Sequence, residues 1–169
     1  VKAVTYNGQT YGVPYAVESV ALVRNDALTS DTPTTYDDLI SSGKASGAEY
    51  PFIIQMGDKG DPYHFYAFQT SFGAPVFKTN SEGEYTAELA MNGSGGTEFA
   101  NWLKAQGDAG IVSPSITGDI AKQKFLDGAA AYTVTGPWNV AAFRAAGMKV
   151  SVLPVPAAGS QAAQPFVGV

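Results

Sequence analysis

The stretch AAAYTVTGPWNVAAF, residues 129–143, decides the fold that the sequence predicts. It begins as an apolar run of the length of a buried strand, turns at Gly136 and Pro137, and continues as an alanine-rich helical pattern. Pro137 suits the first helical position, because the N–H group that it lacks has no helical partner there. Trp138 therefore stands in the first helical turn, just past the end of a strand, where open α/β sheets bind ligands. Taken alone, the pattern favours a core position for Trp138, since tryptophan is highly buried on average.

The composition is typical of a folded globular chain that binds no nucleic acid. The 169 residues are 45% apolar and 15% charged, carry a net charge of −5, and contain no cluster of Lys and Arg of the kind that phosphate backbones require. The chain has no cysteine, and its single histidine, His64, excludes metal sites that need two imidazoles. We therefore expect no metal and no cofactor. No apolar run approaches the roughly 20 residues that span a bilayer.

The first third of the chain carries strand, turn and helix signals in alternation. An Asn-Gly pair at residues 7–8 predicts a hairpin, and an extended segment follows over residues 17–24. Pro14 favours an edge or crossing position for this segment over a central strand. A hydroxyl three residues before a carboxylate, at residues 34–37, predicts a short helix that ends at Gly43.

A second transition from strand to helix follows. Residues 50–56 read as a buried strand, and Asp61 and Pro62 then start a helix as its N-cap and first residue. Tyr63 and His64 stand in the first turn of that helix, beside the end of the preceding strand. Both transitions thus place an aromatic residue in the first turn of the following helix.

The later segments continue the alternation of strands and helices. We expect an exposed hairpin at residues 77–85, helices over residues 97–106 and 117–128, a strand at residues 150–152 and a loop over residues 157–164. Trp102 is predicted to pack in the core. Strands alternating with helices predict an α/β sheet with helices on its faces. Because the chain starts without a signal peptide and stops inside a strand pattern, we expect a fragment of a longer protein.

Two hypotheses about chemistry follow from the polar and aromatic residues at the element ends. Glu18 and Asp61 could act as the paired carboxylates of a glycoside hydrolase, although Asp61 is explained as a helix cap and Glu18 stands alone in an apolar strand. A saccharide-binding site needs flat aromatic platforms beside carboxylates that accept hydroxyl hydrogen bonds, and Trp138, Tyr63, Asp61 and Glu18 are of these types. We favour binding over catalysis, so the chain is expected not to be an enzyme.

Five segments together carry a family resemblance. In chain order they are YNGQTYGVPYAVESVALVRNDAL, TPTTYDDL, DPYHFYAF, FLDGAAAYTVTGPWNV and PFVGV, of which GVPYAVES, GAAAYTVTGPW and PFVGV are the most specific parts. Together they resemble the extracellular solute-binding proteins of ABC sugar importers, the maltose-binding-protein-like group. In that family two α/β lobes, joined by crossing strands, close over a saccharide, and the liganded form docks on the membrane permease.

The resemblance implies a fold, a division of the chain and a function. The fold is a periplasmic-binding-protein-like class II lobe, a mixed sheet flanked by helices. Residues 1–14 are a short piece of the other lobe or crossing strand, residues 15–165 an incomplete carboxy-terminal lobe, and residues 166–169 the start of the second interlobe crossing. The implied function is a non-catalytic receptor for an oligosaccharide of the maltodextrin kind. It works with permease subunits of an ABC importer, outside the cell or in the periplasm, and the full-length protein is expected to be anchored as a lipoprotein.

Site residues carry over from the family by position. Trp138 matches the family's stacking tryptophan and Tyr63 its aromatic neighbour, while Asp61 lies where the maltose-binding type has a sugar-contacting glutamate. Glu18 matches an acidic position near the hinge, and Tyr15 belongs to the same GVPYAVES segment.

His64 completes the ligand-binding candidates and departs from the family, because the maltose-binding type has a phenylalanine at this position. The side chain of Asp61 is also one methylene shorter than glutamate. Both departures change hydrogen-bond reach and stacking area, so they leave the identity of the sugar open. The same fold with a polyamine, anion or peptide as ligand stays an alternative, in which the acidic groups would admit a cation.

Overall fold

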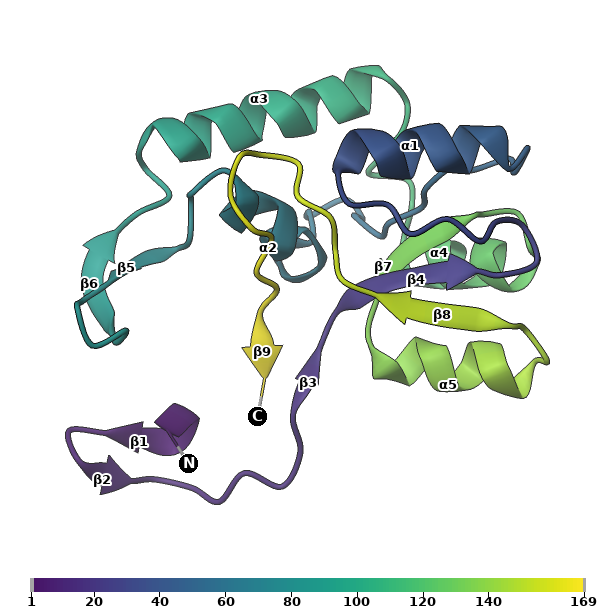
Figure 1. The fold of residues 1–169 in the computed structure, drawn as a ribbon. Coiled ribbons are helices and arrows are strands. Elements are labelled where there is room, and N and C mark those ends of the chain that lie inside the picture. The colour runs from purple at the N-terminus through teal and green to yellow at the C-terminus, as the bar shows by residue number, and fades with distance from the viewer. Residues whose placement is uncertain (1, 169) are drawn as a thin grey trace.

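The computed structural model describes residues 2–168 as five α-helices and nine strands, in the arrangement of Figure 1. The helices are α1 Tyr36–Ala45, α2 Pro62–Ser71, α3 Ser94–Asp108, α4 Gly118–Leu126 and α5 Pro137–Ala145, and the chain opens with a short 3₁₀ turn, Lys2–Val4. The strands are β1 Thr5–Tyr6, β2 Gln9–Thr10, β3 Glu18–Ser19, β4 Ala21–Asn25, β5 Phe77–Thr79, β6 Tyr85–Leu89, β7 Tyr132–Thr135, β8 Val150–Leu153 and β9 Val167–Gly168. No helix in this part of the chain is long and apolar enough to cross a membrane.

The central sheet has the strand order β7-β4-β8, and β4 is antiparallel to both neighbours. The register pairs Leu22 with Val134 on one side and with Leu153 on the other. The predicted edge position is therefore wrong for β4, which lies in the middle. The predicted edge position is correct for β3, which lies outside this sheet and, among the described residues, pairs only with β9. Pro14 precedes both strands, so it removes no hydrogen bond from the central ladder.

Residues 50–56 run beside β7 without forming the predicted strand. Two isolated parallel bridges, Tyr50 to Ala130 and Ile53 to Thr133, join them to the segment that contains β7. Pro51 lies between these bridges and has no N–H to donate, which interrupts the ladder. The predicted burial is correct, because residues 52–54 are all buried.

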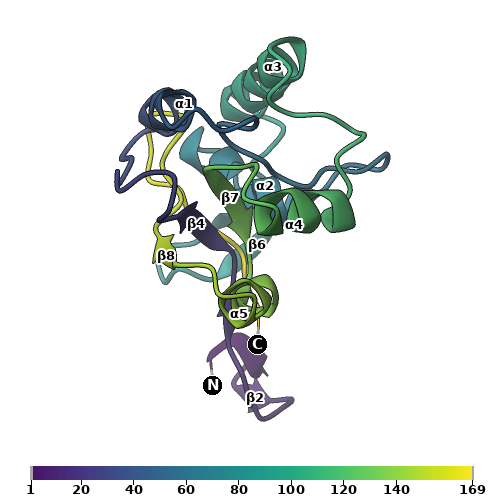
Figure 2. The ribbon, with the colours of Figure 1, turned by 90° about the vertical axis from the view of Figure 1, so that its right-hand side faces the viewer.

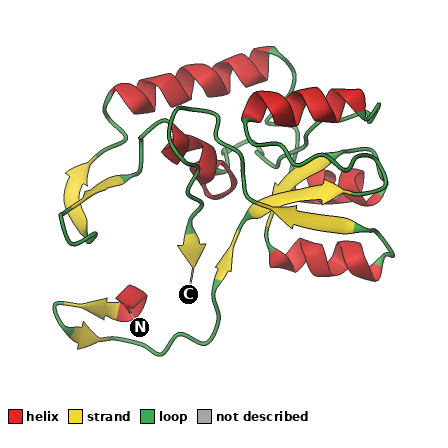
Figure 3. Cartoon of the chain, viewed as in Figure 1, coloured by secondary structure: helices red, strands yellow, loops and turns green. Residues whose placement is uncertain are grey.

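Apolar side chains fill both faces of the sheet. Leu22 packs in a cluster with residues of α1 and α2, whereas Val23, the next residue of β4, packs in a second cluster with residues of α4 and α5. Successive side chains of a strand point to opposite faces, so these neighbours belong to different layers. Figure 2 shows α1 and α3 on one side of the sheet and α5 on the other, and Figure 3 shows the same layers by element type. The predicted mixed sheet flanked by helices is confirmed.

The predicted helix α1 is present, but its capping pair lies one residue later than residues 34–37 predict, and it ends later than Gly43. Thr35 and Asp38 form a capping box, in which each side chain accepts a hydrogen bond from the other residue's backbone N–H. The helix continues through Gly43 to Ala45. A Cβ atom at Gly43 would overlap the carbonyl group of Pro51, so this glycine permits close packing between the helix and residues 50–56. The left-handed residue that follows the helix is Gly47, with φ of +73°.

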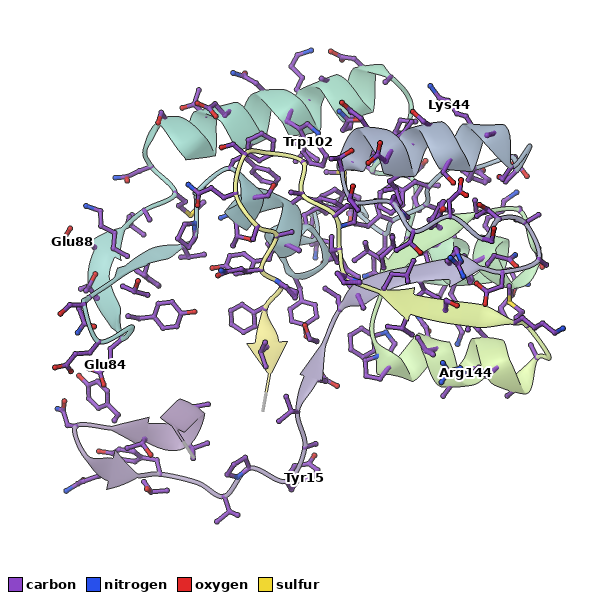
Figure 4. The ribbon with its side chains drawn as sticks, in the orientation of Figure 1. Tyr15, Lys44, Glu84, Glu88, Trp102 and Arg144 are labelled. Carbon is purple, nitrogen blue, oxygen red and sulfur yellow. The ribbon has the colours of Figure 1, made fainter. Side chains whose placement is uncertain are left out.

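The N-terminal hairpin lies apart from the sheet and its helices. Strands β1 and β2 pair through Asn7 and Gly8, both with positive φ, as the Asn-Gly signal predicts. An extended segment then leads to β3 (Figure 1). Its apolar side chains are exposed, and Tyr15 is 98% exposed and points away from the sheet in Figure 4. Such a run of uncovered apolar groups is typical of a surface that packs against another body.

The close approach at Gly43 yields a stability prediction with a matched control. Gly43→Ala is expected to lower the free energy of unfolding by about 1–3 kcal/mol, because the new methyl group must push back the backbone at Pro51. Gly107→Ala, in helix α3, meets no atom closer than 4.0 Å and should be neutral or stabilising by roughly 0.5–1 kcal/mol. Urea denaturation of both variants measures the difference. Equal stabilities would contradict the packing described for α1.

Candidate ligand-binding site

The turn from β7 into α5 exposes Trp138. Gly136 is the N-cap of α5 and Pro137 its first residue, as predicted. The indole of Trp138 lies against Gly136, where a Cβ atom would overlap ring atoms Cζ3 and Cη2. Trp138 is 42% exposed, so the core position that the pattern alone favours is wrong. Trp102 does pack against the core, with its ring 5.0 Å from Tyr36 between centroids.

The start of α2 brings further rings to Trp138. Asp61 caps this helix by accepting a hydrogen bond of 3.0 Å from the backbone N–H of His64. The ring of Tyr63 lies 6.4 Å from that of Trp138 between centroids, with an interplanar angle of 36°. The imidazole of His64 meets Trp138 edge to face, at 6.1 Å. Two helix starts far apart in sequence thus share one aromatic surface.

Two further rings, which the sequence did not indicate, extend this surface. Phe166 lies 6.0 Å from Tyr63 and 5.6 Å from Tyr66, and it is exposed. The hydroxyl of Ser19 in β3 donates to the carbonyl oxygen of Phe166 at 2.9 Å, which fixes the returning chain beside the site. We call Trp138, Tyr63, His64, Tyr66 and Phe166 the aromatic face. Tyr66 follows Tyr63 by three residues, a spacing that places both on one side of the helix.

Glu18 belongs to the surroundings of the aromatic face, and Tyr15 does not. Partial burial and the negative charge of Glu18 together raise the pKa of Tyr63, so the carboxylate of Glu18 lies near that phenol. Glu18 pairs with Gly168 in the two-stranded ladder of β3 and β9 and is exposed. Tyr15 lies three residues earlier, on the exposed segment before β3, and makes none of the ring contacts of the aromatic face.

Asp61 is held by protein donors on both carboxylate oxygens. Oδ1 accepts from the backbone N–H of His64 and from its ring nitrogen Nδ1, at 2.9 Å, while Oδ2 accepts from the side-chain amide of Gln55. Partial burial raises the pKa of Asp61, but these hydrogen bonds and the neighbouring imidazole outweigh it and bring the pKa below its usual value. The ionised form is therefore the stable one in the folded chain.

His64 carries an unpaired polar atom. The residue is 5% exposed, and its Nε2 has no hydrogen-bond partner within residues 2–168. A buried polar atom without a partner destabilises a fold by roughly 1–3 kcal/mol. Among the described residues, no group of three side chains is placed to hold a metal ion.

The whole chain matches one family model. This model, for bacterial extracellular solute-binding proteins, covers residues 1–169. The chain belongs to this family.

Relatives and a solved structure agree with that assignment. The chain is 26% identical to the maltodextrin-binding protein of Bacillus subtilis, over 92% of this chain and 39% of that protein. It is 29% identical to a maltooligosaccharide ABC transporter solute-binding lipoprotein of Streptococcus pneumoniae, over 89% of this chain and 37% of that protein. A crystal structure of a cyclo/maltodextrin-binding protein complexed with maltotetraose superposes with a TM-score of 0.81 and 31% identity, over 98% of this chain and 43% of that chain.

These matches confirm the fold and the resemblance that the sequence motifs carried. The chain spans about two fifths of the length of the curated relatives that it matches. Both relatives are named for binding a solute, which agrees at the family level with a role outside catalysis.

Two hollows of the described part, with volumes of about 400 and 570 Å³, lie away from the aromatic face. One is lined by residues from Asp31 to Ala45, and the other lies between the end of β4 and the loops after α4 and α5.

The contact between Gly136 and Trp138 predicts a spectroscopic change. Gly136 has φ of −99°, which alanine adopts freely, so Gly136→Ala should displace only the indole. In a Trp102→Phe background, where Trp138 is the sole tryptophan, we expect the emission maximum to move to longer wavelength while the free energy of unfolding changes by less than about 1 kcal/mol. Gly107→Ala in the same background is the control. An unchanged spectrum would show that the ring does not rest on Gly136.

The lowered pKa of Asp61 predicts a pH dependence of stability. A carboxyl group whose pKa is lower in the folded than in the unfolded state stabilises the fold fully above the unfolded value, about 4, and loses that contribution as the pH falls through the folded value. Asp61→Asn keeps a good N-cap but lacks the charge. It should be less stable by roughly 1 kcal/mol at pH 7.

The difference in free energy of unfolding between Asp61→Asn and the unchanged chain should narrow as the pH falls from 4 towards 2, because both chains then carry an uncharged residue at this position. Urea denaturation at each pH measures it. Asp58→Asn, in the exposed loop before α2, is the control and should follow the unchanged chain. A difference that stays constant with pH would contradict the account of Asp61.

Proposed function

We propose that this chain is the incomplete carboxy-terminal lobe of a carbohydrate receptor of an ABC importer, which binds an oligosaccharide of the maltodextrin kind without transforming it. The observation that carries the proposal is the pairing of Trp138 and Tyr63, whose rings lie 6.4 Å apart at the starts of two helices. Sugar rings have flat apolar C–H faces, and aromatic rings can stack on these faces because they are also flat and apolar. Glu18 supplies a carboxylate at the edge of this platform that can accept sugar hydroxyls.

The relatives support the class of ligand. Their names specify maltodextrin and maltooligosaccharide, and the similar solved structure holds maltotetraose. A face with two exposed rings, Trp138 and Phe166, and two partly exposed ones suits a ligand with several sugar units, because different rings can cover different units. We therefore assign an oligosaccharide and not a single sugar to this lobe.

The protonation of Asp61 argues against the hydrolase alternative. A glycoside hydrolase needs one carboxylic acid with a raised pKa, so that it can protonate the leaving oxygen. The pKa of Asp61 is held below its usual value, and both of its oxygens accept hydrogen bonds from the protein. Such a carboxylate is a poor proton donor, so Asp61 is unsuited to the role of the catalytic acid.

The pairing of β3 with β9 supports the proposed division of the chain. Residues 1–14 are assigned to the other lobe or crossing strand, residues 15–165 to the carboxy-terminal lobe, and residues 166–169 to the second crossing. Two segments nearly 150 positions apart in sequence run antiparallel at the border of the lobe, which suits two interlobe crossings (Figure 1). In the full-length protein we assign an extracellular or periplasmic location, a lipid anchor and docking on permease subunits.

Calorimetric titration of the full-length protein with maltotetraose tests the proposal. We expect binding, and we expect Trp138→Ala to weaken it at least tenfold, because the largest ring of the platform is removed. Tyr85→Ala removes an aromatic ring that is 72% exposed on β6, outside the aromatic face, and should leave the affinity unchanged.

Two outcomes would overturn the proposed function. Absence of binding to maltotetraose and to a wider saccharide panel, with binding of a polyamine or a peptide instead, would keep the fold and change the ligand. Turnover of an aryl glycoside that is lost in Asp61→Asn would establish the hydrolase.

A further inference from the structure

We propose that His64 contacts the ligand, its ring nitrogen Nε2 accepting a hydrogen bond from a saccharide hydroxyl group, and that Asp61 is a positioning residue that acts through His64. The inference rests on the proposed saccharide binding and assigns a specific polar contact within that site. The observation behind it is the buried Nε2 atom, which has no partner within the part of the chain that the structure describes.

The direction of the hydrogen bond follows from Asp61. An ionised carboxylate has no hydrogen to donate, so the 2.9 Å contact between Oδ1 and Nδ1 of His64 requires that Nδ1 carries the hydrogen. In a neutral imidazole the other nitrogen, Nε2, is then an acceptor. A sugar hydroxyl is a donor of matching size, whereas an aliphatic or anionic ligand has no hydrogen for this atom.

The same contacts leave Asp61 little capacity of its own. A carboxylate has about four acceptor positions, and three protein hydrogen bonds already occupy those of Asp61. His64 has one of its two ring nitrogens unoccupied. Each residue thus keeps about one acceptor position, but only the Nε2 atom of His64 is a buried atom with no partner among the described residues. This differs from the direct sugar contact that the family resemblance implies for the acidic residue.

Access to Nε2 requires movement of a neighbouring ring. The imidazole packs edge to face against Tyr63, at 5.7 Å, and against Trp138, at 6.1 Å. We assign this movement to Trp138, because its ring is the more exposed of the two and stands in the first turn of α5. A saccharide that stacks on the displaced indole then brings a hydroxyl group to Nε2. Stacking and the hydrogen bond are two parts of one binding event.

The tautomer is directly measurable, because His64 is the only histidine in these 169 residues. Long-range proton–nitrogen NMR spectra of the ¹⁵N-labelled chain at pH 8 should show one imidazole with the hydrogen on Nδ1. Asp61→Asn should increase the population of the other tautomer, and Asp58→Asn should not. An imidazole that carries its hydrogen on Nε2 in the unchanged chain would overturn the proposal.

Affinity for maltotetraose in the full-length protein tests the contact itself. His64→Phe keeps a ring of similar size without nitrogens, so it should weaken binding about tenfold. His64→Gln retains an acceptor oxygen and should lose less affinity than His64→Phe. A purely structural role for His64, through its hydrogen bond to Asp61, predicts a lower midpoint of thermal unfolding in His64→Phe with unchanged affinity, and unchanged affinity would overturn the proposal.

A double-mutant cycle separates Asp61 from His64. If Asp61 acts through the histidine, Asp61→Asn weakens binding in the unchanged protein and has no further effect in the His64→Phe background. Additive losses would show a direct contact of Asp61 and overturn its positioning role. Failure of the unchanged protein to bind any saccharide would overturn the proposed function as well, whereas binding that His64→Phe leaves intact would overturn this inference alone.

Discussion

The pairing of β4 with both β7 and β8 is the interaction on which the rest of the structure depends. Ala21 at the start of β4 lies opposite Thr135, the last residue of β7, so β3 extends past the end of β7 on the side where α5 begins. β3 in turn holds β9, and the hydroxyl of Ser19 holds the carbonyl group of Phe166. One strand register thus brings the turn before Trp138 close to β3 and β9 at the same end of the central sheet.

The core on both faces of the sheet is covered by helices, whereas the aromatic face is partly exposed. The sheet carries apolar clusters on both faces, whereas the aromatic face lies beyond the end of β7 and has no opposing wall in this chain. The buried Nε2 atom of His64 has no partner among the described residues and reduces stability, while Trp138 and Phe166 leave aromatic surface in water. Local features that reduce stability in this way are typical of binding sites, which agrees with the proposed role of this face.

Local sequence signals predict where α2 and α5 begin, but they do not predict the segments that pack around these two helix starts. The Gly-Pro-Trp turn and the Asp-Pro cap depend on neighbouring residues, so the sequence predicts the helix positions of Trp138 and Asp61 correctly, although not the exposure of Trp138. The sequence wrongly predicts that the helix ends at Gly43, because the close contact of Gly43 with Pro51 is a tertiary one. It wrongly predicts a continuous strand over residues 50–56, because a hydrophobic pattern does not show that Pro51 lacks a hydrogen-bond donor. Phe166 joined the site only through the pairing of β3 with β9, which has no local signal. The sequence also could not show that the oxygens of Asp61 are occupied.

The central claim is that the aromatic face is one half of a saccharide site. Calorimetric titration of maltotetraose into the chain of residues 1–169, and in parallel into the full-length protein, tests it most directly. The account predicts that the isolated chain binds at least about a hundredfold more weakly than the full-length protein, because one wall cannot remove the ligand from water. Equal affinities would show that this lobe holds the complete site and would contradict the account.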